Sequence, residues 1–109
     1  IILAVEPADF RKGIDGLSQI SKSVLKSDPF SGYLFVFMNK RRTAIKMLLY
    51  DGQGFWLFQK RLSKGRFKWW PNKNGEIQIR LLVHELQLLM WNGNPQSAQT
   101  APFWKKIPS

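Results

Sequence analysis

Hydrophobic positions in the first third of the chain predict a strand, a helix and a second strand. Residues 1–5 form an apolar run with β-branched members, which is typical of a buried strand. From about Gly13 to Leu25 apolar residues recur at helical spacing, and Asp9 is placed as a helix cap. Residues 33–38 are apolar on both alternating faces, which predicts a central strand covered on two sides, with a helix across one of them.

The middle of the chain predicts a β-hairpin. Residues 43–50 and 55–62 read as strands, and the turn sequence Asp51-Gly52-Gln53-Gly54 lies between them. We therefore expect these two segments to pair in antiparallel fashion.

A second hairpin is predicted around Lys64-Gly65, with residues 66–70 returning along the strand before it. A two-residue loop would place Arg61 opposite Lys68, and a longer loop that includes Ser63 would place Lys60 there instead. Either register puts two like charges across a strand pair, which costs up to about 1 kcal/mol unless an anion neutralises them. We prefer the two-residue loop because it separates an apolar face from a basic one.

The last third predicts a strand, a helix and a tail. After a turn at residues 71–75, residues 77–81 alternate as a half-exposed strand, and residues 82–91 are apolar enough for a short helix that stops at Asn92-Gly93. Residues 94–109 predict a flexible tail. The expected fold is a single α+β domain over residues 1–93, with a mostly antiparallel sheet of about five strands and two helices.

Length and composition favour one domain in a reducing compartment. The chain has 109 residues, 44% of them hydrophobic, which is enough for one core and too few for two. The absence of cysteine excludes a disulfide framework and a thiolate metal site. No apolar run approaches the roughly 20 residues of a membrane-spanning helix, so we expect a cytoplasmic protein without membrane contact.

The distribution of charge points to a polyanionic partner. The formal net charge is +10, and ten of the seventeen Lys and Arg residues lie between Lys40 and Lys73, where Asp51 is the one acid. Positive groups interleaved with aromatic residues suit nucleic acid, because cations release condensed counterions and aromatic faces stack on bases. Charge alone is equally compatible with an acidic protein or an anionic membrane surface.

The candidate contacts in this window are basic, apart from one aromatic residue. We expect Trp56, Phe58, Phe67 and Trp69 to lie in the core, which leaves Trp70 available for stacking. Cations on an edge strand also protect a sheet against aggregation, so that explanation stays open. The candidates are Lys40, Arg41, Arg42, Lys60, Arg61, Lys64, Arg66, Lys68, Trp70 and Lys73.

Residues suited to catalysis are few, and we expect neither an enzyme nor a metal or other cofactor. His84 is the one histidine, in an apolar stretch where a packed or hydrogen-bonded imidazole is expected and not a general base. Four acids, Asp9, Asp28, Asp51 and Glu76, could be assembled into a two-metal nuclease site. Each has a simpler role as a cap or turn residue.

Several segments together resemble a known family. They are PADFRKGIDGL at residues 7–17, DPFSGYLFVF at 28–37, NKRR at 39–42, YDGQGFWL at 50–57, KRL at 60–62 and GRF at 65–67. In this order and spacing, from about residue 5 to residue 91, the chain closely resembles the small accessory protein of insertion sequence 66 family transposable elements. That family is often called TnpB, the second reading frame product, and is distinct from the RNA-guided nuclease of the same name.

The resemblance implies a bacterial protein encoded beside a larger transposase, required for transposition and without assigned catalytic residues. Recurring basic positions of the family that match here are Arg11, Lys12, Lys40, Arg41, Arg42, Lys60, Arg61 and Arg66. We expect a nucleoid-associated component of this DNA recombination system, with duplex DNA and the element-encoded transposase as partners. The alternatives are a module that docks the transposase through its aromatic sheet face without touching DNA, and a binder of single strands or RNA.

Overall fold

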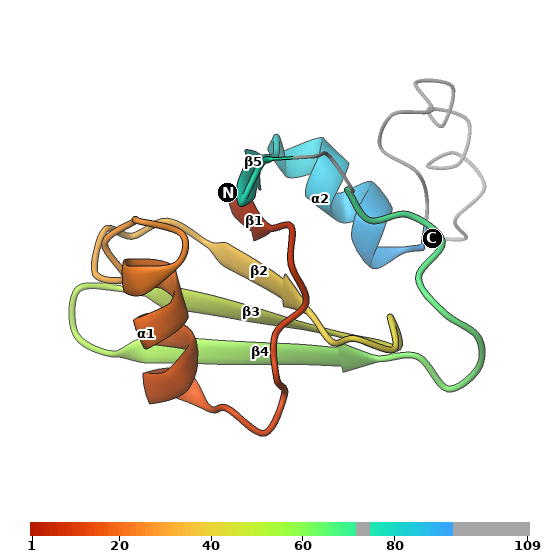
Figure 1. Ribbon diagram of the computed structural model, residues 1–109, viewed down its shortest axis with the longest axis horizontal. Helices are drawn as coiled ribbons and strands as arrows, with labels where there is room; N and C mark the ends of the chain where they lie inside the picture. The colour runs from red at the N-terminus through yellow and green to blue at the C-terminus, as the bar shows by residue number, and fades with distance from the viewer. Residues whose placement is uncertain (72–74, 93–109) are drawn as a thin grey trace, which may run out of the picture.

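Five strands form one sheet in the part of the chain that the computed structural model describes, which is residues 1–71 and 75–92 (Figure 1). Their order across the sheet is β4-β3-β2-β1-β5. Along the chain the elements are β1 (Ile2–Ala4), α1 (Ile14–Ser23), β2 (Phe35–Met38), β3 (Ala44–Tyr50), β4 (Phe55–Arg61), β5 (Gln78–Arg80) and α2 (Val83–Met90).

The sheet is mixed but mostly antiparallel, which confirms the expected α+β class. β1 and β2 run parallel because α1 carries the chain back between them, and the other three strand pairs are antiparallel. The β3–β4 hairpin has the predicted turn, whose backbone N–H groups at Gln53 and Gly54 donate to the Asp51 carboxylate.

The two helices cover opposite faces of the sheet, here called the α1 face and the α2 face. Successive side chains of a strand point to opposite faces, so the apolar residues of β1, β2 and β3 divide into two clusters. The α1-face cluster contains Ile2, Ala4, Ala8, Leu17, Leu25, Phe35, Phe37 and Leu48. The α2-face cluster contains Leu3, Val36, Met38, Ile45, Phe67, Trp70, Leu81 and Leu89.

The predicted cap at Asp9 is wrong. α1 begins after Gly13, which makes no side-chain cap hydrogen bond. The Asp9 carboxylate instead accepts hydrogen bonds from the backbone N–H and the guanidinium of Arg11. Three residues separate Asp9 from Gly13, so a local turn satisfies the carboxylate before the helix starts.

The second predicted hairpin is also wrong, because residues 62–71 contain no strand. The chain leaves β4, turns at Gly65 with a φ of +74°, and crosses onto the α2 face. There Phe67 and Trp70 are 2% and 7% exposed. Burying two large aromatic rings contributes about 1.5–3 kcal/mol each, more than the cross-strand pairs of a short ribbon would.

The tail, the domain boundary at residue 93 and Lys73 lie outside the described residues. Among the residues that are described, neither helix has the length and apolar content needed to cross a membrane.

Candidate nucleic-acid interface

The β2–β3 turn presents three cations in succession on a well-bonded backbone. The Asn39 side-chain oxygen accepts from the backbone N–H of Thr43 (2.9 Å) and of Ala44 (3.1 Å), and its amide donates to the Thr43 hydroxyl. Arg42 has a φ of +61°, a left-handed conformation unusual for a side chain of its size. The turn thereby holds Lys40, Arg41 and Arg42 exposed to solvent.

A second basic segment follows β4 and runs beside this turn. Arg61 is the register partner of Ala44, the backbone N–H of Leu62 donates to Thr43 (2.9 Å), and that of Phe67 donates to Arg42 (2.8 Å). The two backbones are therefore joined at both ends of the segment. We call the exposed cations of the two segments the basic tip: Lys40, Arg41, Arg42, Arg61, Lys64 and Arg66.

A loop before α1 lies against the same end of the sheet. The Lys46 ammonium, on a side chain only 8% exposed, donates to the backbone oxygens of Phe10 (2.9 Å) and Lys12 (3.1 Å) and lies 5.0 Å from the Phe10 ring centroid. A cleft of about 400 Å³ separates this loop from Lys40 and Arg41. Arg11 and Lys12 are thus held on the loop that forms the far wall of this cleft.

The basic tip is not neutralised internally. The single ion pair found within residues 1–71 and 75–92 joins Arg11 to Asp9 at 2.8 Å. The side-chain hydrogen bond from Arg11, followed by its backbone N–H, lowers the pKa of Asp9 to about 2. All six cations of the tip lack a carboxylate at ion-pair distance among the described residues, so their field is directed to solvent.

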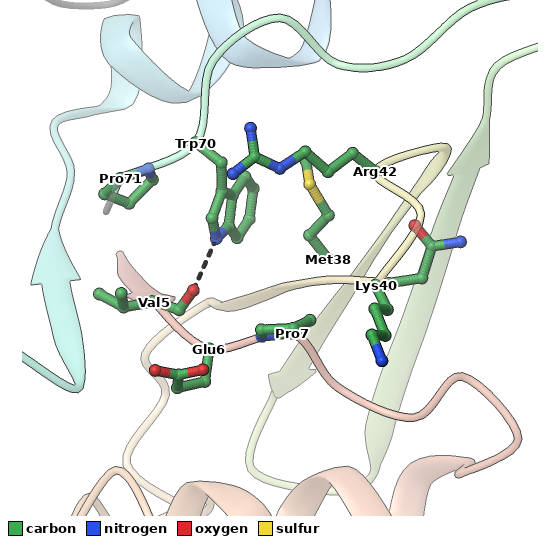
Figure 2. A pocket seen from close by; sticks show the side chains of 9 residues that line it. Val5, Glu6, Pro7, Met38, Lys40, Arg42, Trp70 and Pro71 are labelled. Carbon is green, nitrogen blue, oxygen red and sulfur yellow. Dashed lines mark hydrogen bonds between the residues drawn. The ribbon is translucent and has the colours of Figure 1, made fainter. Parts of the chain in front are cut away.

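Trp70 cannot serve as the predicted stacking platform. Its indole Nε1 donates to the backbone oxygens of Ala4 (3.1 Å) and Val5 (3.2 Å), and Figure 2 shows the ring set between the strand end at Val5 and the side chain of Arg42. Lys40 and Arg42 line a small cleft of about 200 Å³ beside the ring. Trp70 therefore fastens the crossing segment to β1, a role that its position in a basic run did not indicate.

Two of the exposed aromatic residues are ones that the sequence placed in the core. Phe67 is buried as predicted, but Trp56 and Phe58 are 53% and 43% exposed on the α2 face of β4. Their rings are parallel within 5°, with centroids 6.0 Å apart, and the Trp56 indole donates to Asp51 (2.8 Å). These side chains are exposed because α2 does not cover β4. The hydrophobic pattern of a strand does not indicate how much of a sheet a helix covers, so the sequence could not predict this exposure.

Two further predicted contacts lie away from the basic tip. The half-buried Lys60 projects onto the α2 face, where its ammonium donates to the backbone oxygen of Met90 and lies 5.7 Å from the Trp91 ring centroid. A cation at the C-terminal end of a helix is favourably placed in the field of the helix dipole. Lys68 is exposed, and its backbone N–H donates to Asn92 (2.7 Å).

The candidate catalytic residues do not converge. His84 is exposed at the start of α2, so the predicted packed imidazole is wrong. Asp28 and Asp51 have the predicted turn roles, with Asp28 accepting from the backbone N–H of Phe30 (2.9 Å). Within the described ranges no group of three or more His, Cys, Asp or Glu side chains is arranged to hold a metal ion.

An apolar groove lies between α2 and β4 on the α2 face. Its volume is about 350 Å³, and one of its lining residues, Gln87, is polar. The lining residues are Leu34, Met47, Leu49, Phe58, Leu86, Gln87, Met90 and Trp91, which we call the α2 groove.

Comparisons with known proteins agree on one family. The family described as "IS66 Orf2 like protein" matches residues 1–100. The chain is similar to the uncharacterized proteins y4jC and y4hO of Sinorhizobium fredii (strain NBRC 101917 / NGR234). It is 38% identical to y4jC over 79 residues, covering 72% of this chain and 68% of the relative. It is 40% identical to y4hO over 77 residues, covering 71% and 67%. No solved structure matches the chain significantly.

Proposed function

The chain belongs to the family of IS66 Orf2-like proteins, and from this premise we propose that it binds duplex DNA without catalysing a reaction on it. Family membership implies an accessory protein of an insertion sequence. In the proposal, the basic tip attaches this accessory protein to the element's DNA at the bacterial nucleoid, beside the transposase.

The observation that carries the proposal is the convergence of cations from two separate segments on one end of the sheet. Lys40, Arg41 and Arg42 come from the β2–β3 turn, and Arg61, Lys64 and Arg66 follow β4. Backbone hydrogen bonds between the two segments fix the distance between them. Little backbone conformational entropy is therefore lost when phosphates bind. Charges that only keep a protein soluble need not lie close together on its surface. The grouping of these cations therefore favours DNA binding over a general solubilising role.

The chemistry of the tip favours contact with the phosphate backbone over recognition of bases. Arg and Lys both bind phosphate oxygens, and Arg does so with two parallel hydrogen bonds. Base reading in the major groove is done by a helix or a two-stranded ribbon that enters it. Neither α1 nor α2 carries the tip, and β2 and β3 are strands inside a five-stranded sheet and not a free two-stranded ribbon, so the proposal predicts weak dependence on sequence.

A salt titration tests this proposal. Fluorescence anisotropy with a labelled duplex at several ionic strengths should give a slope of log affinity against log salt of about −5, if about six phosphates are contacted. Replacing Arg61, Lys64 and Arg66 with Gln should reduce the slope to about −3. Replacing Lys22 and Lys26, at the opposite end of the sheet from the tip, is the control and should leave it unchanged. A slope near zero for the unmodified protein would refute the proposal.

Competition identifies the form of nucleic acid. Unlabelled duplex should displace the probe better than single-stranded DNA or RNA of the same length, because the buried Trp70 offers no stacking face. Better competition by single strands would contradict the proposal of duplex binding. It would favour the exposed Trp56 and Phe58 as the contact surface.

The α2 groove supports a second candidate function, docking of the transposase. It is apolar and open, and docking surfaces of this kind are typically rimmed by polar residues. This candidate would be favoured if capture of the transposase survives nuclease treatment and high salt. Capture should then be lost on Leu86→Lys and retained when the basic tip is neutralised. Loss of capture after nuclease treatment would favour DNA as the link.

A further inference from the structure

β4 is an edge strand whose cations, Lys60 and Arg61, lie at one end only, and whose remaining residues lack the usual protection against pairing with another chain. It is seven residues long, pairs with β3 in one continuous register from Phe55 to Arg61, and contains neither proline nor a bulge. In the part of the chain that the structure describes, no strand pairs with its outer edge. A long, regular and partly apolar edge is a template for strand addition.

The hydrogen bonds of the hairpin determine which backbone groups point outward. At one end the N–H of Leu62 donates to Thr43, and at the other the oxygen of Gly54 accepts from Asp51. Even-numbered residues of β4 therefore direct their backbone groups toward β3, because these groups alternate along a strand. The odd-numbered residues direct theirs outward: Phe55, Leu57, Gln59 and Arg61.

We propose that β4 pairs in antiparallel fashion with β4 of a second copy of this chain, about a two-fold axis at Phe58. In this register Phe55 of one copy lies opposite Arg61 of the other, and Leu57 lies opposite Gln59. These four residues are the ones with outward-directed backbone groups, so all seven positions of the strand pair and every outward group gains a partner. The result is one continuous sheet across both copies.

The side chains on the α2 face favour the same register. Phe58 lies opposite its own equivalent, and the two residues form a non-hydrogen-bonded pair in which side chains approach closely. Lys60 lies opposite Trp56 of the other copy, so the position across from it holds an aromatic residue and not a second lysine. A register centred on Lys60 would place two lysines opposite each other, which is unfavourable.

Pairing also covers the aromatic pair that α2 leaves exposed. Trp56 and Phe58, 53% and 43% exposed, lie at the edge where the second copy would be added. The four rings of the dimer would form a row across the two-fold axis. Aromatic cross-strand pairs are among those that stabilise a sheet.

The first test compares Gln59→Pro with Gln59→Ala in sedimentation velocity. Gln59 is exposed and its N–H points outward, so proline removes a donor to the second copy and leaves the bonds to β3 intact. The samples are treated with nuclease and measured at high ionic strength. Under these conditions the unmodified protein and Gln59→Ala should sediment as dimers. Gln59→Pro should sediment as a monomer and keep an unchanged circular dichroism spectrum. A monomeric unmodified protein, or a Gln59→Pro variant that folds and remains dimeric, would overturn the proposal.

The second test uses the absence of cysteine from the sequence, so that any cysteine introduced is the only one. Phe58→Cys should form an intermolecular disulfide under mild oxidation, because the two sulfurs would meet at the axis. Trp56→Cys is the matched control and should cross-link poorly, since its counterpart in the other copy is Lys60. Equal cross-linking of the two variants, or cross-linking of Trp56→Cys alone, would contradict the register.

Discussion

The two faces of β4 are covered to different extents. On the α1 face, Phe55 and Leu57 are partly buried and pack against the cluster that α1 closes. On the α2 face, Trp56 and Phe58 are more exposed although they are large and apolar. The difference follows from the helices: α1 packs over both β3 and β4, whereas α2 packs over the other end of the sheet.

This asymmetry shows that β4 is well packed on the α1 face and has apolar surface to spare on the α2 face. A residue's contribution to folding should therefore depend on how well its site is covered more than on its hydrophobicity. Pairs of like residues in covered and uncovered sites allow this statement to be tested.

The first pair is Phe37→Ala and Phe58→Ala. Phe37 is fully buried in the α1-face cluster, so its truncation should lower the free energy of unfolding by about 3–5 kcal/mol. Phe58 is already 43% exposed, and its loss should cost about 1 kcal/mol. Urea denaturation of each variant, at a protein concentration low enough for the chain to be monomeric, measures both. Equal losses would remove the distinction between the two faces.

The second pair is Lys46→Met and Lys60→Met, two lysines that donate to backbone carbonyls. Lys46 is buried and holds two carbonyl oxygens of the loop before α1, so its replacement should cost about 2–3 kcal/mol. Lys60 donates to one carbonyl in a more accessible site and should cost about 1 kcal/mol. Thermal unfolding of the two variants checks the order, and a larger loss for Lys60→Met would reverse it.

The third pair, Trp70→Phe and Trp56→Phe, removes an indole N–H and keeps an aromatic ring. Trp70 bonds two buried carbonyl oxygens, which would be left without this donor, so we expect a loss of about 1–2 kcal/mol. Trp56 donates to a solvated carboxylate, and its replacement should cost less than about 0.5 kcal/mol. Chemical denaturation distinguishes the two, and similar losses would show that burial does not set the difference.

The fourth pair concerns two exposed carboxylates and has the smallest effect on stability. The pKa of Asp9 is about 2, lowered chiefly by the Arg11 side chain, whereas that of Asp51 is lowered chiefly by the N–H groups of Gly54 and Gln53. Because the folded pKa of Asp9 lies below its ordinary value of 3.8, its contribution is complete above about pH 4 and is lost as the pH falls through about 2.

The variant Arg11→Met should therefore return the pKa of Asp9 toward 3.8 and leave that of Asp51 unchanged. Titration of the carboxyl carbons by nuclear magnetic resonance measures both groups in one experiment. A low pKa for Asp9 that persists in the variant would assign the shift to the backbone of the turn and not to the guanidinium.

The elements of the sheet could be predicted from sequence because their signals are local. Alternation in β5, unbroken hydrophobicity in β1 and β2, and the Asp51–Gly54 turn each depend on neighbouring residues alone. The parallel pairing of β1 with β2 had no such signal, since it depends on where α1 returns the chain. The six cations of the basic tip were all among the candidates chosen from the sequence, but the sequence could not show which of the other candidates the fold places elsewhere.

The residues after β4 could not be predicted by the same rules. The segment Arg66 to Trp70 alternates like a strand, yet Phe67 and Trp70 are both buried by a chain that crosses the α2 face. The interaction that competes with strand formation is the hydrogen bonding of the Trp70 indole to the carbonyls of Val5 and Ala4. These residues lie 65 and 66 positions earlier in the chain. Lys60 and Lys68 were both candidate contacts, and the fold directs the Lys60 side chain to the C-terminal end of α2.

The position of β1 between β2 and β5 also has a consequence for synthesis on the ribosome. β1 is translated first, and its second edge is completed only by residues 78–80, which pair with it in antiparallel fashion. Until those residues emerge, a nascent chain that has already formed α1 and the first four strands leaves one edge of the apolar strand β1 unpaired. Unpaired edges of this kind are where incompletely folded chains associate. The protein is therefore most vulnerable to aggregation after β4 has formed and before residues 78–80 have emerged.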